Sequence, residues 1–183
     1  DAEVKPYLQM EKIREGIFWA SKQLFDFNWT EVSGVPVVRP EIRVWKVSRS
    51  NGDLIGLWYF DPYAREGKSS GASMNEYRTQ ERIKGDIKPI VSNNCNFTKG
   101  KPGEPELISW DDANTMFHEF GHAIHGLNSD VTYPSLAGTN VPADFVEFIK
   151  RERLFATFLT PSEFADGNPD KRWDAARNAA LSE

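Results

Sequence analysis

The residues best suited to chemistry lie in one short stretch of the 183-residue chain. All three histidines, His118, His122 and His125, fall within this stretch, and Glu119 follows the first of them. On a helix with about 100° per residue, the first two imidazoles lie about 40° and one turn apart, so both can bind one metal ion. Glu119 lies about 100° from His118, beside the pair, where its carboxylate reaches a water rather than the metal.

A His-Glu-x-x-His pattern on a helix predicts a zinc hydrolase site. Zinc binds neutral imidazole nitrogens and carboxylate oxygens in a roughly tetrahedral site and leaves one position for water. It lowers the pKa of that water to about 7, so that Glu119 can take a proton as general base. The alternative is a chance match to three fixed positions. The helical context argues against chance, because the histidines lie off the apolar face.

The third ligand has to come from elsewhere in the chain. His125 lies two turns from His118, roughly 10 Å away by helical rise, so we interpret it as a polar neighbour of the site rather than as a ligand. A downstream carboxylate is the remaining choice. Asp144 and Glu147 share a face of a predicted second helix, and one could bind the metal while the other orients a ligand histidine. Their spacing alone does not decide between them.

Several elements are expected around these residues. A helix over 109–127 begins with a capping box formed by Ser109 and Asp112. The other expected elements are a helix over 6–25, β-rich segments over 35–47, a hairpin turn over 48–53, a strand over 54–60, a loop over 61–75, a strand within 88–97 and helices after 160. This order predicts an α+β fold, with a small antiparallel sheet packed on the 109–127 helix.

Composition excludes several classes of protein. The net charge of -5 argues against a nucleic-acid binder, and 12 Phe and 6 Trp argue against disorder. No apolar run approaches the roughly 20 residues of a membrane span, and the first residues do not form a signal peptide. Cys95 is the single cysteine, which excludes an intrachain disulfide and suits the cytoplasm. We interpret it as a small buried residue.

Three segments together carry a family resemblance. They are His-Glu-Phe-Gly-His-Ala-Ile-His-Gly-Leu at 118–127, Tyr-Pro-Ser-Leu-Ala-Gly-Thr-Asn at 133–140 and Asp-Phe-Val-Glu-Phe at 144–148. They resemble the M3 family of zinc metallopeptidases, and within it the bacterial peptidyl-dipeptidases, or dipeptidyl carboxypeptidases. The likeness covers roughly residues 5–148. It implies a zincin-like core over 1–148 followed by a divergent or truncated helical segment over 149–183.

The resemblance assigns roles to particular residues. It implies that one zinc ion is held by His118, His122 and Glu147, with Glu119 as the catalytic general base. It therefore favours Glu147 over Asp144. The oligomeric state and the role of His125 stay open.

The resemblance also implies a substrate. Members of the family cleave short peptides, and peptidyl-dipeptidases release C-terminal dipeptides, whereas related oligopeptidases cut internally. A peptide adds along a strand edge near the metal, for which the candidates here are the segment 71–74 and the strand before Asn94, by β-augmentation. Ordinary loop and core packing is the alternative interpretation of both segments.

Departures from the family pattern open two further interpretations. Ile-Lys-Arg-Glu at 149–152 replaces the usual Pro-Ser-Gln, and neither a Tyr after Tyr133 nor a His after His125 is present to stabilise an oxyanion. The chain is therefore either a peptidase or an incomplete, non-catalytic zinc-binding part of one. A structural or peptide-binding module with an accidental motif is the third interpretation.

Overall fold

The computed structural model describes residues 4–101 and 103–140. Asp144, Glu147 and the predicted helical segment 149–183 lie outside the described residues. The α-helices are α1 (Met10–Phe25) and α2 (Trp110–Leu127), and the strands are β1 (Asn28–Val32), β2 (Arg43–Ser48), β3 (Leu54–Tyr63), β4 (Ser73–Arg78) and β5 (Ile90–Phe97). Short 3-10 helices cover Lys5–Tyr7 (η1), Pro134–Leu136 (η2) and Gly138–Asn140 (η3).

The five described strands form one mixed sheet in the order β1-β2-β3-β5-β4. β1 pairs with β2, β2 with β3 and β4 with β5, all antiparallel, whereas β3 and β5 run parallel. The expectation of an antiparallel sheet was therefore wrong at its centre. After β3 the chain crosses to the edge as β4 and returns as β5 between the two. The α+β class is confirmed.

Local signals predicted most of the elements. The hairpin turn lies where Asn-Gly predicted it, and Gly52 adopts a φ of 92° there. The first helix and the strand within 88–97 are confirmed, although α1 begins only at Met10. The apolar run 35–38 lies outside the strands, because Pro36 cannot donate a ladder hydrogen bond. The loop expected over 61–75 was partly wrong, since β3 reaches Tyr63 and β4 begins at Ser73.

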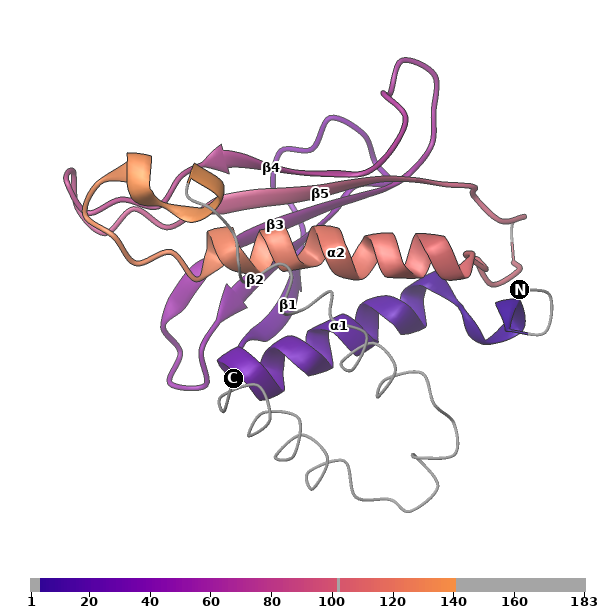
Figure 1. Ribbon diagram of the computed structural model, residues 1–183, viewed down its shortest axis with the longest axis horizontal. Helices are drawn as coiled ribbons and strands as arrows, with labels where there is room; N and C mark the ends of the chain where they lie inside the picture. Colours follow the sequence, from indigo (N-terminus) through magenta and orange to yellow (C-terminus); the bar gives the residue numbers. More distant parts are fainter. Residues whose placement is uncertain (1–3, 102, 141–183) are drawn as a thin grey trace.

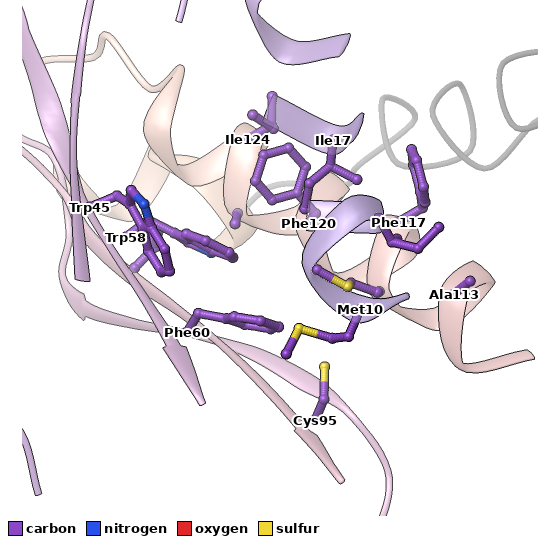
Figure 2. Close-up of a cluster of buried hydrophobic side chains, with 14 of the residues drawn as sticks. Met10, Ile17, Trp45, Trp58, Phe60, Cys95, Ala113, Phe117, Phe120 and Ile124 are labelled. Atoms are coloured by element: carbon purple, nitrogen blue, oxygen red, sulfur yellow. The ribbon is translucent and has the colours of Figure 1, made fainter. Parts of the chain in front are cut away.

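Both helices cover the same face of the sheet, and the core lies between these two layers (Figures 1 and 2). Trp58 of β3 is completely buried at the centre of an aromatic cluster. Its ring centroid lies 5.0 Å from that of Phe60 and 5.5 Å from that of Phe120 on α2. Aromatic pairs in such stacked and edge-on geometries add to the stabilisation from burial alone. The aromatic cluster therefore connects the helix that carries the histidines to β3.

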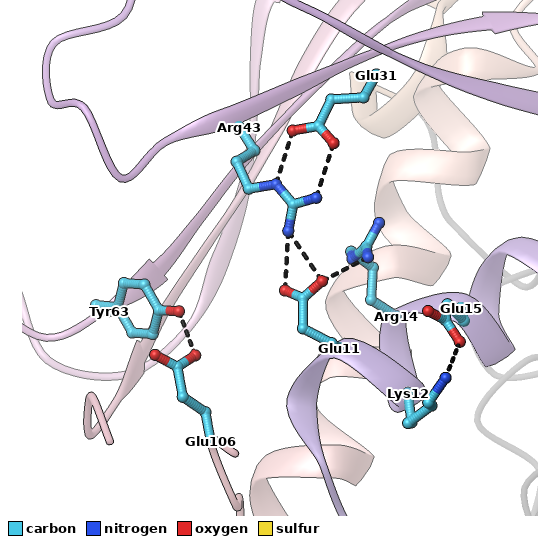
Figure 3. A network of polar contacts seen from close by, with 8 residues as sticks. All are labelled: Glu11, Lys12, Arg14, Glu15, Glu31, Arg43, Tyr63 and Glu106. Carbon is cyan, nitrogen blue, oxygen red and sulfur yellow. Dashed lines mark hydrogen bonds and ion pairs between the residues drawn. The ribbon is translucent and has the colours of Figure 1, made fainter. Parts of the chain in front are cut away.

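A network of ion pairs attaches α1 to the first two strands (Figure 3). Arg43 of β2 donates two hydrogen bonds of 2.8 Å to Glu31 on β1 and two of 2.9 Å to Glu11 on α1. Arg14 donates to the same Glu11 carboxylate at 2.6 Å. A bidentate guanidinium–carboxylate pair fixes direction as well as distance. This network therefore orients α1 on the sheet.

The segment just before α2 pairs with the chain just before α1. Met10 N–H donates to the carbonyl of Glu106, and Ile108 N–H donates to that of Leu8, both at 2.9 Å. The Tyr63 hydroxyl at the end of β3 donates to the Glu106 carboxylate (Figure 3). These contacts fix where α2 starts relative to the sheet.

None of the helices in the described part of the chain combines the length and the apolar character needed to cross a bilayer. The cytoplasmic location stays a prediction.

Candidate metal centre

The start of α2 is fixed by the predicted capping box. The Ser109 hydroxyl accepts a 3.0 Å hydrogen bond from the Asp112 N–H, and the Asp112 carboxylate accepts one of 3.1 Å from the Ser109 N–H. Asp111 adds a second negative charge to the first turn, where the helix dipole is positive. Both effects favour a helix that begins at Trp110 and sets the phase of every later residue.

His118 and His122 meet as the helical spacing predicts. Their Nε2 atoms lie 3.1 Å apart, and the ring planes are inclined at 85°. Two ligands of a tetrahedral zinc ion, each about 2.0–2.1 Å from the metal, lie about 3.3 Å from one another. The observed separation is close to that value. The pair therefore fits zinc as two of its ligands.

Burial favours the ionisation state that a metal requires. Burial lowers the pKa of His122, and the charges of His118 and His125 lower it further. A depressed pKa keeps the imidazole neutral, and the neutral imidazole is the form that binds metals.

Glu119 is buried beside the histidine pair, and burial raises the pKa of its carboxyl group. A carboxylate with a raised pKa is a stronger base, which suits the acid–base role expected of this residue.

The third ligand lies beyond what the structure places. No group of three His, Cys, Asp or Glu side chains suited to a metal ion exists within residues 4–101 and 103–140. Asp144 and Glu147 lie outside the described residues, so the choice between them stays a prediction. His125 is half-buried, one turn beyond His122. Its assignment as a neighbour rather than a ligand also stays a prediction.

Sequence reasoning missed one residue that contacts the backbone of the motif itself. Asn93 on β5 is 2% exposed, and its side-chain amide donates a 2.6 Å hydrogen bond to the carbonyl of Glu119. Its carbonyl oxygen accepts a 2.6 Å hydrogen bond from the indole of Trp58. The available signal was periodicity, since Asn93 alternates with apolar Val91 and Cys95 on the core-facing side of the strand.

The two candidate strand edges differ in position. Asn94 belongs to β5, which has β3 on one side and β4 on the other and therefore has no open edge in the described sheet. The segment 71–74 leads into β4, which lies at the edge. Met74 and Glu76 of β4 pack against Gly126 of α2, where an added Cβ would meet each of them at 3.0 Å. The edge strand therefore lies directly against the end of the histidine helix.

Several donors hold the loop that enters β4. The Lys68 ammonium donates to the carbonyls of Asp61 and Tyr63 at 3.0 and 2.9 Å, and also to that of Cys95. The Asn96 amide donates to the carbonyl of Ser69 at 2.8 Å. This loop is thereby attached to β3 and β5, and β4 begins from a fixed position.

Comparison with known proteins agrees with this geometry. The model of peptidase family M3 matches residues 1–149. The chain is 38% identical to dipeptidyl carboxypeptidase of Escherichia coli (strain K12) over 190 residues, which cover 99% of this chain and 28% of that protein. It is 42% identical to dipeptidyl carboxypeptidase of Salmonella typhimurium over 99% of this chain and 28% of that protein.

Oligopeptidase A of Salmonella typhimurium is 35% identical over 80% of this chain and 22% of its own length. The chain thus spans only about a quarter of the length of the curated relatives it matches. Its matched residues include the whole sheet, both helices and the paired histidines. On these grounds the chain belongs to peptidase family M3.

Proposed function

We propose that this chain carries the zinc-binding part of a peptidase that hydrolyses short peptides. In this proposal His118, His122 and Glu147 hold one zinc ion. The observation that carries it is the convergence of two histidine Nε2 atoms at 3.1 Å on one helix. The family membership supports the same function.

The residues of the chain have separate tasks in the proposed reaction. When bound, zinc would act as a Lewis acid that lowers the pKa of a bound water and polarises the peptide carbonyl. Glu119 accepts the proton of the attacking water and transfers it to the nitrogen of the departing amine. Burial lowers the pKa of His122 and so favours the neutral imidazole that binds the metal.

The exposed edge of β4 is the proposed site for the backbone of the peptide. Its position at the edge, beside the last turn of α2, supports this role over that of β5. An extended peptide gains affinity there from main-chain hydrogen bonds, which are largely independent of its sequence. Release of C-terminal dipeptides is the proposed outcome, because two relatives carry the name dipeptidyl carboxypeptidase.

Zinc binding without turnover is the second candidate function. The sequence Ile-Lys-Arg-Glu at 149–152, which replaces the Pro-Ser-Gln usual in the family, favours it. Internal cleavage, as the name oligopeptidase A of another relative suggests, is the third.

Metal analysis of the purified chain tests the zinc site. We expect one zinc per chain, and we expect His118→Ala to abolish stoichiometric binding. Glu147→Gln should lower zinc affinity, whereas the matched variant Asp144→Asn should leave it close to that of the wild type. An equal loss in both carboxylate variants, or a chain without zinc, would contradict the proposed ligand set.

Activity measurements with Glu119→Gln test the general base. The variant should keep its zinc and lose peptide hydrolysis, because the amide cannot accept the proton. Release of dipeptides from peptides with a free C-terminus, but not from amidated ones, would support the carboxypeptidase activity. Hydrolysis that survives in Glu119→Gln would refute the assigned role.

A further inference from the structure

Asn93 is a buried side chain that connects the sheet to the backbone of the histidine motif. The orientation of its amide follows from its partners. The Trp58 indole only donates, so it faces the amide oxygen, and the Glu119 carbonyl only accepts, so it faces the amide nitrogen. Both hydrogen bonds measure 2.6 Å and both lie within the core. The amide is thus locked between β3 and α2.

This contact differs in kind from its surroundings. Much of the interface between α2 and the sheet consists of apolar packing by residues such as Phe120 and Ile124. Apolar packing is non-directional, so it resists separation of the helix from the sheet more than it resists sliding along the helix axis. A hydrogen bond loses strength steeply when its length or angle changes. The contact from Asn93 therefore adds an axial constraint in the middle of α2 to the contacts that fix where the helix starts.

The same residue lies in line with the edge strand. In the sheet register Asn93 is opposite Met74 of β4 on one side and opposite Phe60 of β3 on the other. One row of residues thus runs from α2 through β5 to the edge strand β4, and it consists of Glu119, Asn93 and Met74. A shift of α2 would move the histidines relative to every group that α2 does not itself carry.

We propose that Asn93 is a positioning residue. It holds α2 at the position along its axis where the His118–His122 pair can meet the third ligand and a peptide on β4. The distance between the two histidines is set by the helix alone, so the role of Asn93 concerns their relation to other elements. This inference rests on the proposed function. It assigns a role in the metal site to a side chain of the sheet, whereas the histidines lie on a helix.

Zinc affinity tests the proposal, measured by competition with a chromogenic chelator at a temperature where every variant is folded. Asn93→Asp keeps an acceptor for Trp58 but puts an oxygen against the Glu119 carbonyl. We expect its zinc affinity to fall at least about tenfold, the range known for residues that orient metal ligands. Cobalt substituted for zinc should also lose its intense tetrahedral absorption in this variant.

Two matched controls separate positioning from general stability. Val47→Ala removes buried methyl groups on β2, two strands away from β5, and should lower the melting temperature without changing zinc affinity. Trp58→Phe removes the donor to Asn93 but keeps the bond to Glu119, so its affinity should stay within about threefold of the wild type.

A double variant keeps the test valid if Asn93→Asp does not fold. Trp58→Phe with Asn93→Leu replaces both partners by apolar groups, which leaves no indole donor unpaired in the core. We expect it to fold and to bind zinc at least about tenfold more weakly than Trp58→Phe alone. Equal affinity in these two chains would overturn the role of Asn93. A wild-type chain that binds no zinc would instead refute the proposed function.

Discussion

Glu76 places a carboxylate in a narrow space between two glycines. Its Oε1 atom packs against Gly126 of α2 and Gly138 of η3, and it has no hydrogen-bond partner among the described residues. The Oε2 atom accepts one hydrogen bond of 3.2 Å from Thr79. Burial raises the pKa of Glu76 because the charged form loses hydration there, and the hydrogen bond from Thr79 offsets only part of this.

The raised pKa of Glu76 predicts a pH-dependent loss of stability. Between its unfolded pKa, about 4.3, and its higher folded pKa, the folded state binds more protons. The free energy of unfolding contributed by Glu76 is therefore largest below this window, falls as the pH rises through it, and is constant above it. Glu76→Gln should lack this component, so urea denaturation should show the variant gaining stability relative to the wild type as the pH rises. A difference that is constant between pH 4 and 8 would contradict this.

Residues that act within one element were predictable, and those that act between elements were not. His118 and His122 share a helix, so their convergence follows from helical geometry alone. Asn93 approaches Glu119 only because β5 lies beneath α2, and nothing in its sequence neighbourhood specifies that partner. The choice between Asp144 and Glu147 is of the same kind, since the geometry of α2 does not determine it.

At the level of elements, α2 depends on its cap. Ser109→Ala removes the hydroxyl that accepts the Asp112 N–H, and it should lower the free energy of unfolding by about 1 kcal/mol. Ser109→Asp should recover most of the loss, because aspartate is an equally good N-cap residue. Thermal and urea denaturation of the three chains measure the effect. A loss in Ser109→Ala that Ser109→Asp does not recover would mean that another contact of Ser109 was involved.

The strands that escaped prediction are those at the two edges of the described sheet. β1 and β4 each have a partner on one side only, so their sequences, Asn-Trp-Thr-Glu-Val and Ser-Met-Asn-Glu-Tyr-Arg, mix polar and apolar residues. β3 was recognisable because its inward residues are apolar along a long run. The parallel pairing of β3 with β5 was not accessible from local patterns, because it depends on a crossover through the edge.

For the molecule as a whole, the rate at which the Cys95 thiol is labelled measures unfolding. Its thiol is 1% exposed in the core between the sheet and the helices (Figure 2). Burial raises the pKa of this thiol to about 12, and the charge of Glu119 acts in the same direction. Electrophilic reagents, which react with the thiolate, therefore modify Cys95 only after the helices separate from the sheet.

Labelling kinetics should show this protection. For a domain with about 5 kcal/mol of stability, labelling of Cys95 should be about a thousandfold slower or more than in the unfolded chain. Zinc at 100 times its dissociation constant should slow labelling about a further hundredfold, because it binds only the folded state. Labelling at the same rate with and without zinc would indicate either local opening around Cys95 or a chain without a zinc site.

The inserted position of β5 also constrains the order of assembly. β4 precedes β5 in the chain, yet its one partner in the described sheet is β5. During synthesis β4 therefore emerges with nothing to pair with until β5 has been made. Parallel pairing across such a crossover is intrinsically slow, because the loop must close before any contact rewards it. The edge proposed to receive a peptide is thus formed only after β5 has been made, so a nascent chain that has formed only its first hairpin cannot yet present it.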